Sequence, residues 1–213
     1  YVVASHPHDD HIGGMATVLD SFNIGKMYMP KQAHTITAFT NMLDVIDNKN
    51  IELYTAKAGT SILSSGIIDI DVLAPFADSD SNLNNVSAVV RITYGKTVML
   101  FTGDAEHVIE NQLLNSGIDA DVLKVGHHGA GSASSSSFIK AVSPEVAVIS
   151  VGEGNSYGHP HADTLAILNE VGAKIYRTDE QGTIVVTADQ NKKITVNKKA
   201  STVKENAPPV VVQ

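Results

Sequence analysis

Cysteine and tryptophan are absent from the 213 residues, and aromatic residues make up only 5% of the chain. Without cysteine there are no disulfide bonds and no thiolate ligands for a metal ion. The interior must be built mainly from alanine, valine, isoleucine and leucine, and the hydrophobic fraction of 43% is sufficient for a core. No apolar run approaches about 18 residues, so no membrane-spanning helix is expected in this chain.

Positive charge is also scarce. The chain has 15 basic and 23 acidic residues, which gives a net charge of −8. This balance argues against a large basic surface that holds nucleic acid by counterion release. It does not exclude a nuclease, because bound metal ions can neutralise phosphate charge locally.

Histidine and aspartate, in contrast, are concentrated in one short stretch. Three histidines and two aspartates lie within six consecutive residues, from His6 to His11. Imidazole nitrogens and carboxylate oxygens are ligands of Zn²⁺ and related divalent metals. On an extended chain His6 and His8 point the same way, whereas the adjacent Asp10 and His11 must point elsewhere. The spacing therefore favours two metal ions side by side over one.

A further carboxylate candidate is Asp104, in the sequence Thr102-Gly103-Asp104. A strand is predicted over residues 97–102 and a helix over residues 106–114, so Asp104 lies at their junction. A side chain there can reach outward from the edge of a sheet. The alternative is that Asp104 only caps the helix.

Two histidine pairs follow later strands. His127 and His128 come after one predicted strand, and His159 and His161 come after the next. The alternative for the first pair is an ordinary polar turn. The serine-rich run 131–137 is interpreted as a loop at the mouth of the site, whose hydroxyls and amides can bind an anionic substrate.

The apolar periodicity elsewhere predicts strands alternating with helices, typical of an α/β (α+β) fold. Helices are predicted over residues 13–22, 35–46, 106–114, 138–142 and 162–171, and strands over residues 1–4, 26–29, 51–54, 67–73, 87–94, 97–102, 121–125, 146–151, 174–176, 183–187 and 194–196. The residues expected on the apolar faces of two of these helices are Met15, Val18, Leu19 and Phe22, and Val108, Ile109, Gln112 and Leu113.

The predicted domain covers residues 1–197. From residue 198 to residue 213 the periodicity is lost, and Pro208-Pro209 favours an extended chain. This segment is predicted to be a flexible linker or tail that leads to further domains.

The motif His-x-His-x-Asp-His followed by Gly-Gly resembles the signature of the metallo-β-lactamase superfamily. With Asn-Asn-Val-Ser, Thr-Gly-Asp-Ala, Leu-Lys-Val-Gly-His-His-Gly and Asn-Ser-Tyr-Gly-His-Pro in that order, it is similar to the β-lactamase-like domain of the ComEC/Rec2 competence proteins and their secreted stand-alone relatives. The resemblance implies an αββα sandwich, here N-terminally truncated because the β-hairpin layer that usually precedes the motif is missing. It also implies a metal-dependent hydrolase.

The resemblance also implies a ligand set for two divalent metal ions. One ion would be held by His6, His8 and Asp104. The other would be held by Asp10, His11, Asp104 and a histidine of the last loop, for which His159 is favoured over His161. His128 or His127 would protonate the leaving oxygen or hydrogen-bond the phosphoryl oxygens, unless one of them completes a metal shell. Asp9 and Asn155 would support these ligands indirectly.

One departure from the β-lactamases and lactonases concerns the metal and the substrate. Where those enzymes carry a third histidine, this chain is expected to have Asn85, which agrees with the competence branch. The two ions are expected to be Zn²⁺ or Mn²⁺, because a site richer in oxygen shifts the preference toward Mn²⁺ or Mg²⁺. The same feature argues against β-lactam hydrolysis.

The function implied by the resemblance is a phosphodiesterase or nuclease of the DNA-uptake type at the bacterial surface or outside the cell, with single-stranded DNA as one substrate. The first alternative is a secreted hydrolase of a cell-wall phosphodiester or a small ester. The second is a non-catalytic binding module. A basic patch formed by Lys124, Lys140 and Arg91 would favour DNA over a small ester.

Overall fold

The computed structural model describes residues 1–201, which form two β-sheets and a hairpin. The small sheet is parallel, in the order β1-β2-β3, and consists of β1 (Val2–Val3), β2 (Lys26–Met29) and β3 (Glu52–Thr55). The large sheet has the order β10-β9-β8-β7-β6-β5-β4. Its strands are β4 (Thr60–Ser64), β5 (Ile68–Ala74), β6 (Val89–Tyr94), β7 (Thr97–Phe101), β8 (Val122–Lys124), β9 (Val146–Ile149) and β10 (Lys174–Arg177).

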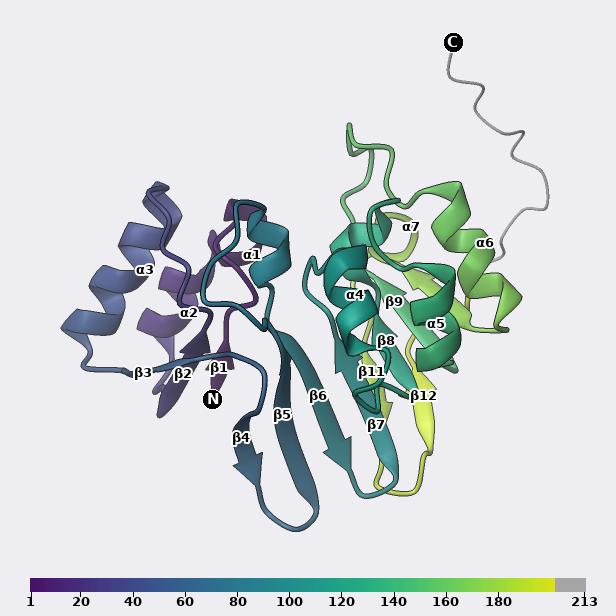
Figure 1. Cartoon of the computed structure of the whole chain (residues 1–213), viewed down its shortest axis with the longest axis horizontal. Helices are drawn as coiled ribbons and strands as arrows, with labels where there is room; N and C mark the ends of the chain where they lie inside the picture. The colour runs from purple at the N-terminus through teal and green to yellow at the C-terminus, as the bar shows by residue number, and fades with distance from the viewer. Residues whose placement is uncertain (202–213) are drawn as a thin grey trace.

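Helices cover the outer faces of both sheets, so the molecule has four layers (Figure 1). On the small sheet lie α2 (Met15–Ser21) and α3 (Thr37–Asn48), and on the large sheet lie α4 (His107–Leu113), α5 (Ser136–Val142) and α6 (Ala162–Glu170). Each interface between layers has its own apolar cluster. Leu19 and Met42 represent the outer cluster on the small sheet, Tyr28 and Val72 the one between the sheets, and the Leu100 cluster lies under α4–α6. The predicted αββα sandwich is confirmed.

Two predicted helix faces were wrong in part. In α2 only Leu19 is buried, while Phe22 is 63% exposed, because nothing in the described part of the chain covers the outer side of this short helix. In α4, Val108 points to solvent and Glu110 is buried in its place. The backbone amides of Ser134 and Ser135 hydrogen-bond the Glu110 carboxylate, which allows this charged residue to face inward.

Some elements were missing from the sequence-based expectations. Strand β4 is a short edge strand that pairs only with β5, so ladder hydrogen bonds stabilise it more than an apolar pattern of its own. The aspartates and His11 form a short helix, α1 (Asp9–Ile12), where a loop was expected. Three more short elements are the 3₁₀ helices η1 (Leu83–Val86) and η2 (Gly126–Gly129), and the helix α7 (Thr178–Gln181).

The C-terminal hairpin pairs β11 (Val186–Ala188) with β12 (Ile194–Val196) and packs against β8, β9 and β10. Chain packing continues beyond the predicted domain end at residue 197, because the backbone N–H of Ser201 donates to the Ile175 carbonyl at 2.8 Å. The rest of the predicted tail, residues 202–213, lies outside the described residues. Within residues 1–201 we find no helix of the length and apolarity that crossing a membrane requires.

The topology gathers the motifs at one end of the molecule. Strands β7, β8 and β9 are parallel neighbours in the large sheet, so the loops that follow them emerge at the same edge. The loop after β1 reaches the same end from the small sheet (upper part of Figure 1). Crevices at the carboxyl ends of parallel strands are common ligand sites.

Candidate metal centre

Asp104 lies at the centre of the polar cluster. Its side chain is almost fully buried, and its backbone N–H donates to the Ser87 hydroxyl at 3.0 Å. Four imidazole Nε2 atoms surround its Oδ2 atom, at 3.2 Å from His11, 3.6 Å from His128, 3.7 Å from His127 and 3.8 Å from His6. Its other oxygen, Oδ1, is buried without a hydrogen-bond partner. Histidines from two distant motifs thus converge on Asp104, the aspartate predicted at the strand–helix junction.

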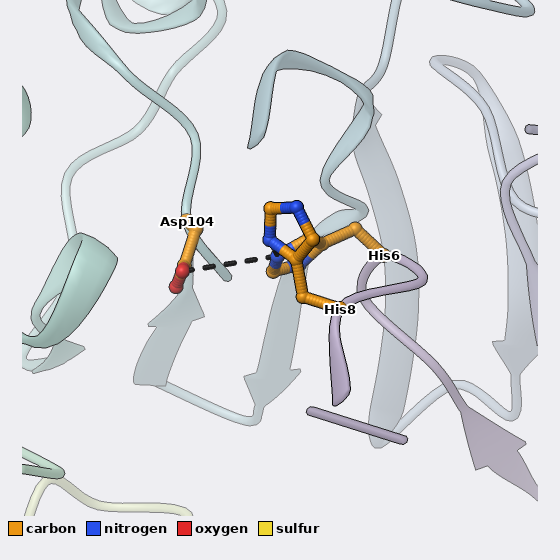
Figure 2. A group of neighbouring side chains, drawn as sticks. All are labelled: His6, His8 and Asp104. Atoms are coloured by element: carbon orange, nitrogen blue, oxygen red, sulfur yellow. Dashed lines mark hydrogen bonds and ion pairs between the residues drawn. The ribbon is translucent and has the colours of Figure 1, made fainter. Parts of the chain in front are cut away.

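The first group with metal-ligand spacing consists of His6, His8 and Asp104, as the sequence predicts. One donor atom from each lies within 4.8 Å of the others. The His6 Nε2 and His8 Nδ1 atoms are 2.9 Å apart. Figure 2 shows the two rings close together and facing the Asp104 carboxylate.

The second group consists of Asp10, His11 and His128. The His128 Nε2 atom is 3.1 Å from Asp10 Oδ2 and 3.2 Å from His11 Nε2. On the other side of its ring, His128 Nδ1 is 2.7 Å from the Ser150 carbonyl oxygen. A carbonyl only accepts, so Nδ1 carries the proton and the Nε2 lone pair of the neutral ring faces the group.

His159 was the expected last ligand of this group, and it lies in neither group. Its ring stacks instead on the His128 ring, with centroids 6.5 Å apart and 15° between planes. His161 is exposed at the position before α6. A metal-ligand role for His159 stays a prediction, while geometry favours His128, the alternative that sequence left open.

His127 is held differently from the other histidines. Its Nδ1 atom lies 3.2 Å from the Ser132 hydroxyl and 3.5 Å from the Glu106 carboxylate, and Ser132 donates to Glu106 at 3.1 Å. Ser132 uses its only proton on Glu106, so both partners of Nδ1 act as acceptors and Nδ1 must carry a proton. The His127 Nε2 atom therefore faces Asp104 as the exchangeable position.

The backbone of the two adjacent histidines is strained. His127 and His128 have φ angles of 47° and 55°, in the left-handed region that side chains other than glycine rarely adopt. Such conformations persist where surrounding contacts fix them and are concentrated at functional sites. Here the strain turns the two neighbouring rings toward the same carboxylate oxygen from different sides.

Glu106 was missed by the sequence reasoning. Besides Ser132 and His127, it accepts hydrogen bonds from the side-chain amides of Asn82 at 2.8 Å and Asn84 at 3.0 Å. One carboxylate thus joins the loop before η1 to the loop after β8. The signal available in the sequence was its position two residues after Asp104.

The asparagine that faces the site is Asn84, whereas the expected one was Asn85. Asn84 lines a pocket of about 540 Å³ together with His8, Asp104 and His127, and Asn85 does not. Both Asn84 and Asn85 have a buried side-chain oxygen with no hydrogen-bond partner. Sequence could not separate these adjacent residues, because the choice depends on how η1 turns.

Electrostatics keeps this cluster in a state that can bind metal ions. Burial, together with the nearby His11, lowers the pKa of His6 to about 3, and burial also lowers the pKa of His8. Burial alone would raise the pKa of Asp104, but the imidazoles of His11, His6 and His128 hold it well below its usual range. At neutral pH the first group is therefore two neutral imidazoles and a carboxylate, the ionisation state that a metal ion requires.

The residues fit divalent cations. Imidazole nitrogens that lie 2.9 Å apart in the first group and 3.2 Å apart in the second need a proton or a cation between them. The unpartnered oxygens of Asp104 and Asn84 are further acceptors without a donor. A mixed set of nitrogen and oxygen donors without sulfur suits Zn²⁺, Mn²⁺ or Fe.

The serine-rich run differs from its expected role. The backbone amides of Ser134 and Ser135 donate to Glu110 at 2.5 and 2.9 Å, and Ser132 donates to Glu106. These amides and this hydroxyl are therefore used inside the protein. Through these contacts the run holds the histidine loop in place, and a substrate-binding role for its other hydroxyls and amides stays a prediction.

The basic patch that would favour DNA over a small ester is reduced to one residue. Lys124 lines a pocket beside Asp10, His11 and His128, and burial lowers its pKa. Lys140 instead pairs with Glu170 at 2.9 Å, and the Arg91 guanidinium donates to the Gly117 carbonyl at 2.7 Å. Among these three cations, only Lys124 lines a pocket at the candidate site, and its Nζ atom donates to the Val125 carbonyl at 2.8 Å.

The sequence matches the family model described as "Metallo-beta-lactamase superfamily" over residues 1–76 and 82–153. It is 31% identical to ComE operon protein 3 of Bacillus subtilis (strain 168) over 185 residues, which cover 86% of this chain and 24% of that protein. It is 37% identical to competence protein ComA of Neisseria gonorrhoeae over 123 residues, 55% of this chain and 17% of that protein.

A third relative, Recombination protein 2 of Haemophilus influenzae, is 27% identical over 90% of this chain and 22% of its own length. The chain thus spans about a quarter or less of the length of these relatives.

Among solved structures, CmlA, a diiron β-hydroxylase from Streptomyces venezuelae, has a TM-score of 0.57 at 14% identity, over 82% of this chain and 42% of that one. The metallo-β-lactamase fold protein YhfI from Bacillus subtilis has a TM-score of 0.51 at 13% identity, over 82% and 72%. These structural likenesses show the fold.

Proposed function

The chain belongs to the metallo-β-lactamase superfamily and has competence proteins as relatives, and from this premise we propose that it is a binuclear-metal phosphodiesterase that cleaves single-stranded DNA during DNA uptake at the bacterial surface. The observation that supports the proposal best is the convergence of two potential metal-binding groups on one carboxylate oxygen, with a separately held histidine beside them. Two adjacent cation sites suit an in-line displacement at phosphorus.

The residues of the two groups would each hold one metal ion. His6, His8 and Asp104 would hold one Zn²⁺ or Mn²⁺ ion, and Asp10, His11 and His128 would hold the other, with Asp104 between them. Bound there, the two ions supply activation of a water molecule and neutralisation of phosphate charge.

His127 is suited to protonate the oxygen of the leaving group. Glu106 and Ser132 fix its Nδ1 proton, which leaves Nε2 directed toward the site as the atom that can give up a proton. A leaving sugar oxygen is strongly basic and needs such a donor, so this step is worth about 10²- to 10⁴-fold in rate. The Lys124 ammonium lies in the adjoining pocket, where it can attract a phosphate oxygen.

The test uses the full chain with added Mn²⁺ or Zn²⁺, a labelled single-stranded oligonucleotide and a simple phosphodiester. The proposal expects metal-dependent cleavage of the oligonucleotide that a chelator abolishes and that Asp104→Asn reduces by at least about 10³-fold. Cleavage of the small diester alone would move the substrate to a cell-wall or metabolite diester. Bound metal without turnover of either substrate would favour a non-catalytic binding module.

A further inference from the structure

The loop between β9 and α6 contains a feature that metal binding does not use. This loop projects at the upper end of the molecule (Figure 1), and its residues Tyr157 and His159 line the same pocket as Asp104. Its Tyr157 is 77% exposed, more than any other large hydrophobic side chain in residues 1–201. Exposing so large an apolar ring to water is unfavourable, and the outer side of this ring packs against no other part of the described chain.

The Tyr157 ring continues a row of aromatic rings that leads into the candidate metal centre. It stacks on His159 with centroids 5.6 Å apart and 22° between planes. His159 in turn stacks on His128 at 6.5 Å and 15°. His128 belongs to the second potential metal group. Tyr157 is thus the outermost ring of the row, with one face covered by His159 and the other free.

Asn155 fixes the loop in this shape. Its Oδ1 atom accepts hydrogen bonds from the backbone N–H groups of Tyr157 at 3.2 Å and His159 at 3.0 Å. Its Nδ2 atom donates to the Gly152 carbonyl at 3.1 Å and the His159 carbonyl at 2.7 Å. The free face of Tyr157 is therefore presented in advance, and little order remains to be created when a ligand binds.

Tyr157 lies at the edge of the space around the metal groups. It lines the pocket of about 540 Å³ that also contains Asp10, Asp104 and His127. It also lines a neighbouring pocket of about 380 Å³ with Thr178 and His128. A flat group stacked on Tyr157 therefore lies beside a phosphate held at the centre.

The geometry points to a nucleobase-stacking platform: we propose that Tyr157, supported by His159, stacks on a base next to the scissile phosphate of single-stranded nucleic acid. This inference rests on the proposed function and specifies its substrate. Bases of a single strand expose their faces, whereas bases in a duplex are already stacked on both sides. Stacking also supplies affinity that does not depend on positive charge, which is scarce here.

The experiment compares single-stranded thymidine oligonucleotides that are intact or carry one abasic residue, scanned along the strand. The full-length variants are Tyr157→Ala, Tyr157→Phe and, as a matched control, Phe22→Ala, which removes an exposed ring at the end of α2. Steady-state cleavage with metal gives kcat and KM, and fluorescence anisotropy gives the binding constant independently of cleavage.

We expect Tyr157→Ala to weaken binding and raise KM by about 5- to 100-fold on intact strands, with kcat changed less, while Tyr157→Phe and Phe22→Ala stay within about twofold of wild type. One abasic position should cause a similar loss in wild type and little further loss in Tyr157→Ala. Equal binding of intact strands by wild type and Tyr157→Ala, or equal losses on intact and abasic strands, would overturn the platform.

The two proposals fail separately in this design. If wild type cleaves every oligonucleotide and Tyr157→Ala does so equally well, the nuclease proposal stands and the platform is rejected. If wild type cleaves none, the nuclease proposal is rejected, and the anisotropy comparison still decides whether Tyr157 binds a base.

Discussion

At the residue scale, four histidine rings are arranged around one oxygen of the Asp104 carboxylate. Four imidazole nitrogens lie within 3.8 Å of its Oδ2 atom, yet the rings differ in what stands behind them. His128 is supported by a backbone carbonyl, whereas His127 is supported by a carboxylate and a hydroxyl. On this difference in support the proposed function assigns His128 to a metal group and His127 to proton donation.

The role of His127 predicts a result for Glu106→Gln. Cleavage of DNA should slow by about 10- to 100-fold, because the Nδ1 partner loses its charge. Cleavage of bis(4-nitrophenyl) phosphate should slow much less, because nitrophenolate leaves without a proton. The measurement is the ratio of kcat/KM values on the two substrates, with Glu153→Gln on an exposed loop as the control. Equal losses on both substrates would indicate a general structural effect.

The identity of the last metal ligand can be tested by comparing two histidines. His128→Ala should weaken binding of the second metal ion by more than about 100-fold, because it removes a donor atom from the group. His159→Ala should retain both ions, since its ring lies outside both groups. Metal content after dialysis against graded chelator concentrations distinguishes the two. Loss of metal only in His159→Ala would restore the sequence-based assignment.

At the scale of elements, Glu110 connects α4 to the loop that precedes α5. Its buried carboxylate accepts the backbone N–H groups of Ser134 and Ser135. This loop also carries Ser132, which contacts His127, so Glu110 indirectly holds the histidine loop in place. A side chain far from any substrate is therefore expected to affect the geometry of the site.

Replacing Glu110 should be costly. Glu110→Ala leaves two buried amides without acceptors, and we expect a loss of about 2–5 kcal/mol in the free energy of unfolding. Glu170→Ala, which removes an exposed partner of Lys140, should cost less than about 1 kcal/mol. Urea denaturation followed by circular dichroism measures both. Similar small losses in the two variants would contradict this role for Glu110.

At the scale of the whole molecule, the buried imidazoles make folding sensitive to acid. The pKa of His6 falls from 6.5 to about 3 in the folded state, and that of His8 is also lowered, in both cases chiefly by burial. Below pH 6.5 the unfolded chain therefore binds protons that the folded chain does not. The folded state is favoured above this pH and loses stability as pH falls toward 3.

The metal-free protein should show this dependence directly. With a chelator present, the free energy of unfolding should fall between pH 6.5 and pH 4, with His6 contributing up to about 1.4 kcal/mol per pH unit. His6→Gln should have a shallower slope even if its stability at pH 7 is lower. Urea titrations at several pH values give the slopes. An unchanged slope in His6→Gln would show that another group controls acid unfolding.

Local patterns were sufficient to predict most strands and helices and the grouping of the central histidines with Asp104. His6, His8 and Asp104 lie together, as the predicted group requires, because the loop after β1 of the small sheet and the loop after β7 of the large sheet reach the same end of the molecule. The inner faces of α2 and α4 were predicted poorly. Periodicity shows that a helix has an apolar face, but burial of Phe22 or Val108 depends on whether another layer covers it.

The sequence by itself determined the superfamily, the cluster of histidines and carboxylates in its motifs, and the absence of thiolate ligands, since these depend only on residue identity and spacing. Only the tertiary structure decided that His128 joins Asp10 and His11, that Asn84 faces the pocket and that Glu106 supports His127. These contacts connect residues that are adjacent to equally plausible candidates or lie far apart along the chain. The backbone turns at η1 and η2 decide which side chain points inward, and no local pattern encodes those turns.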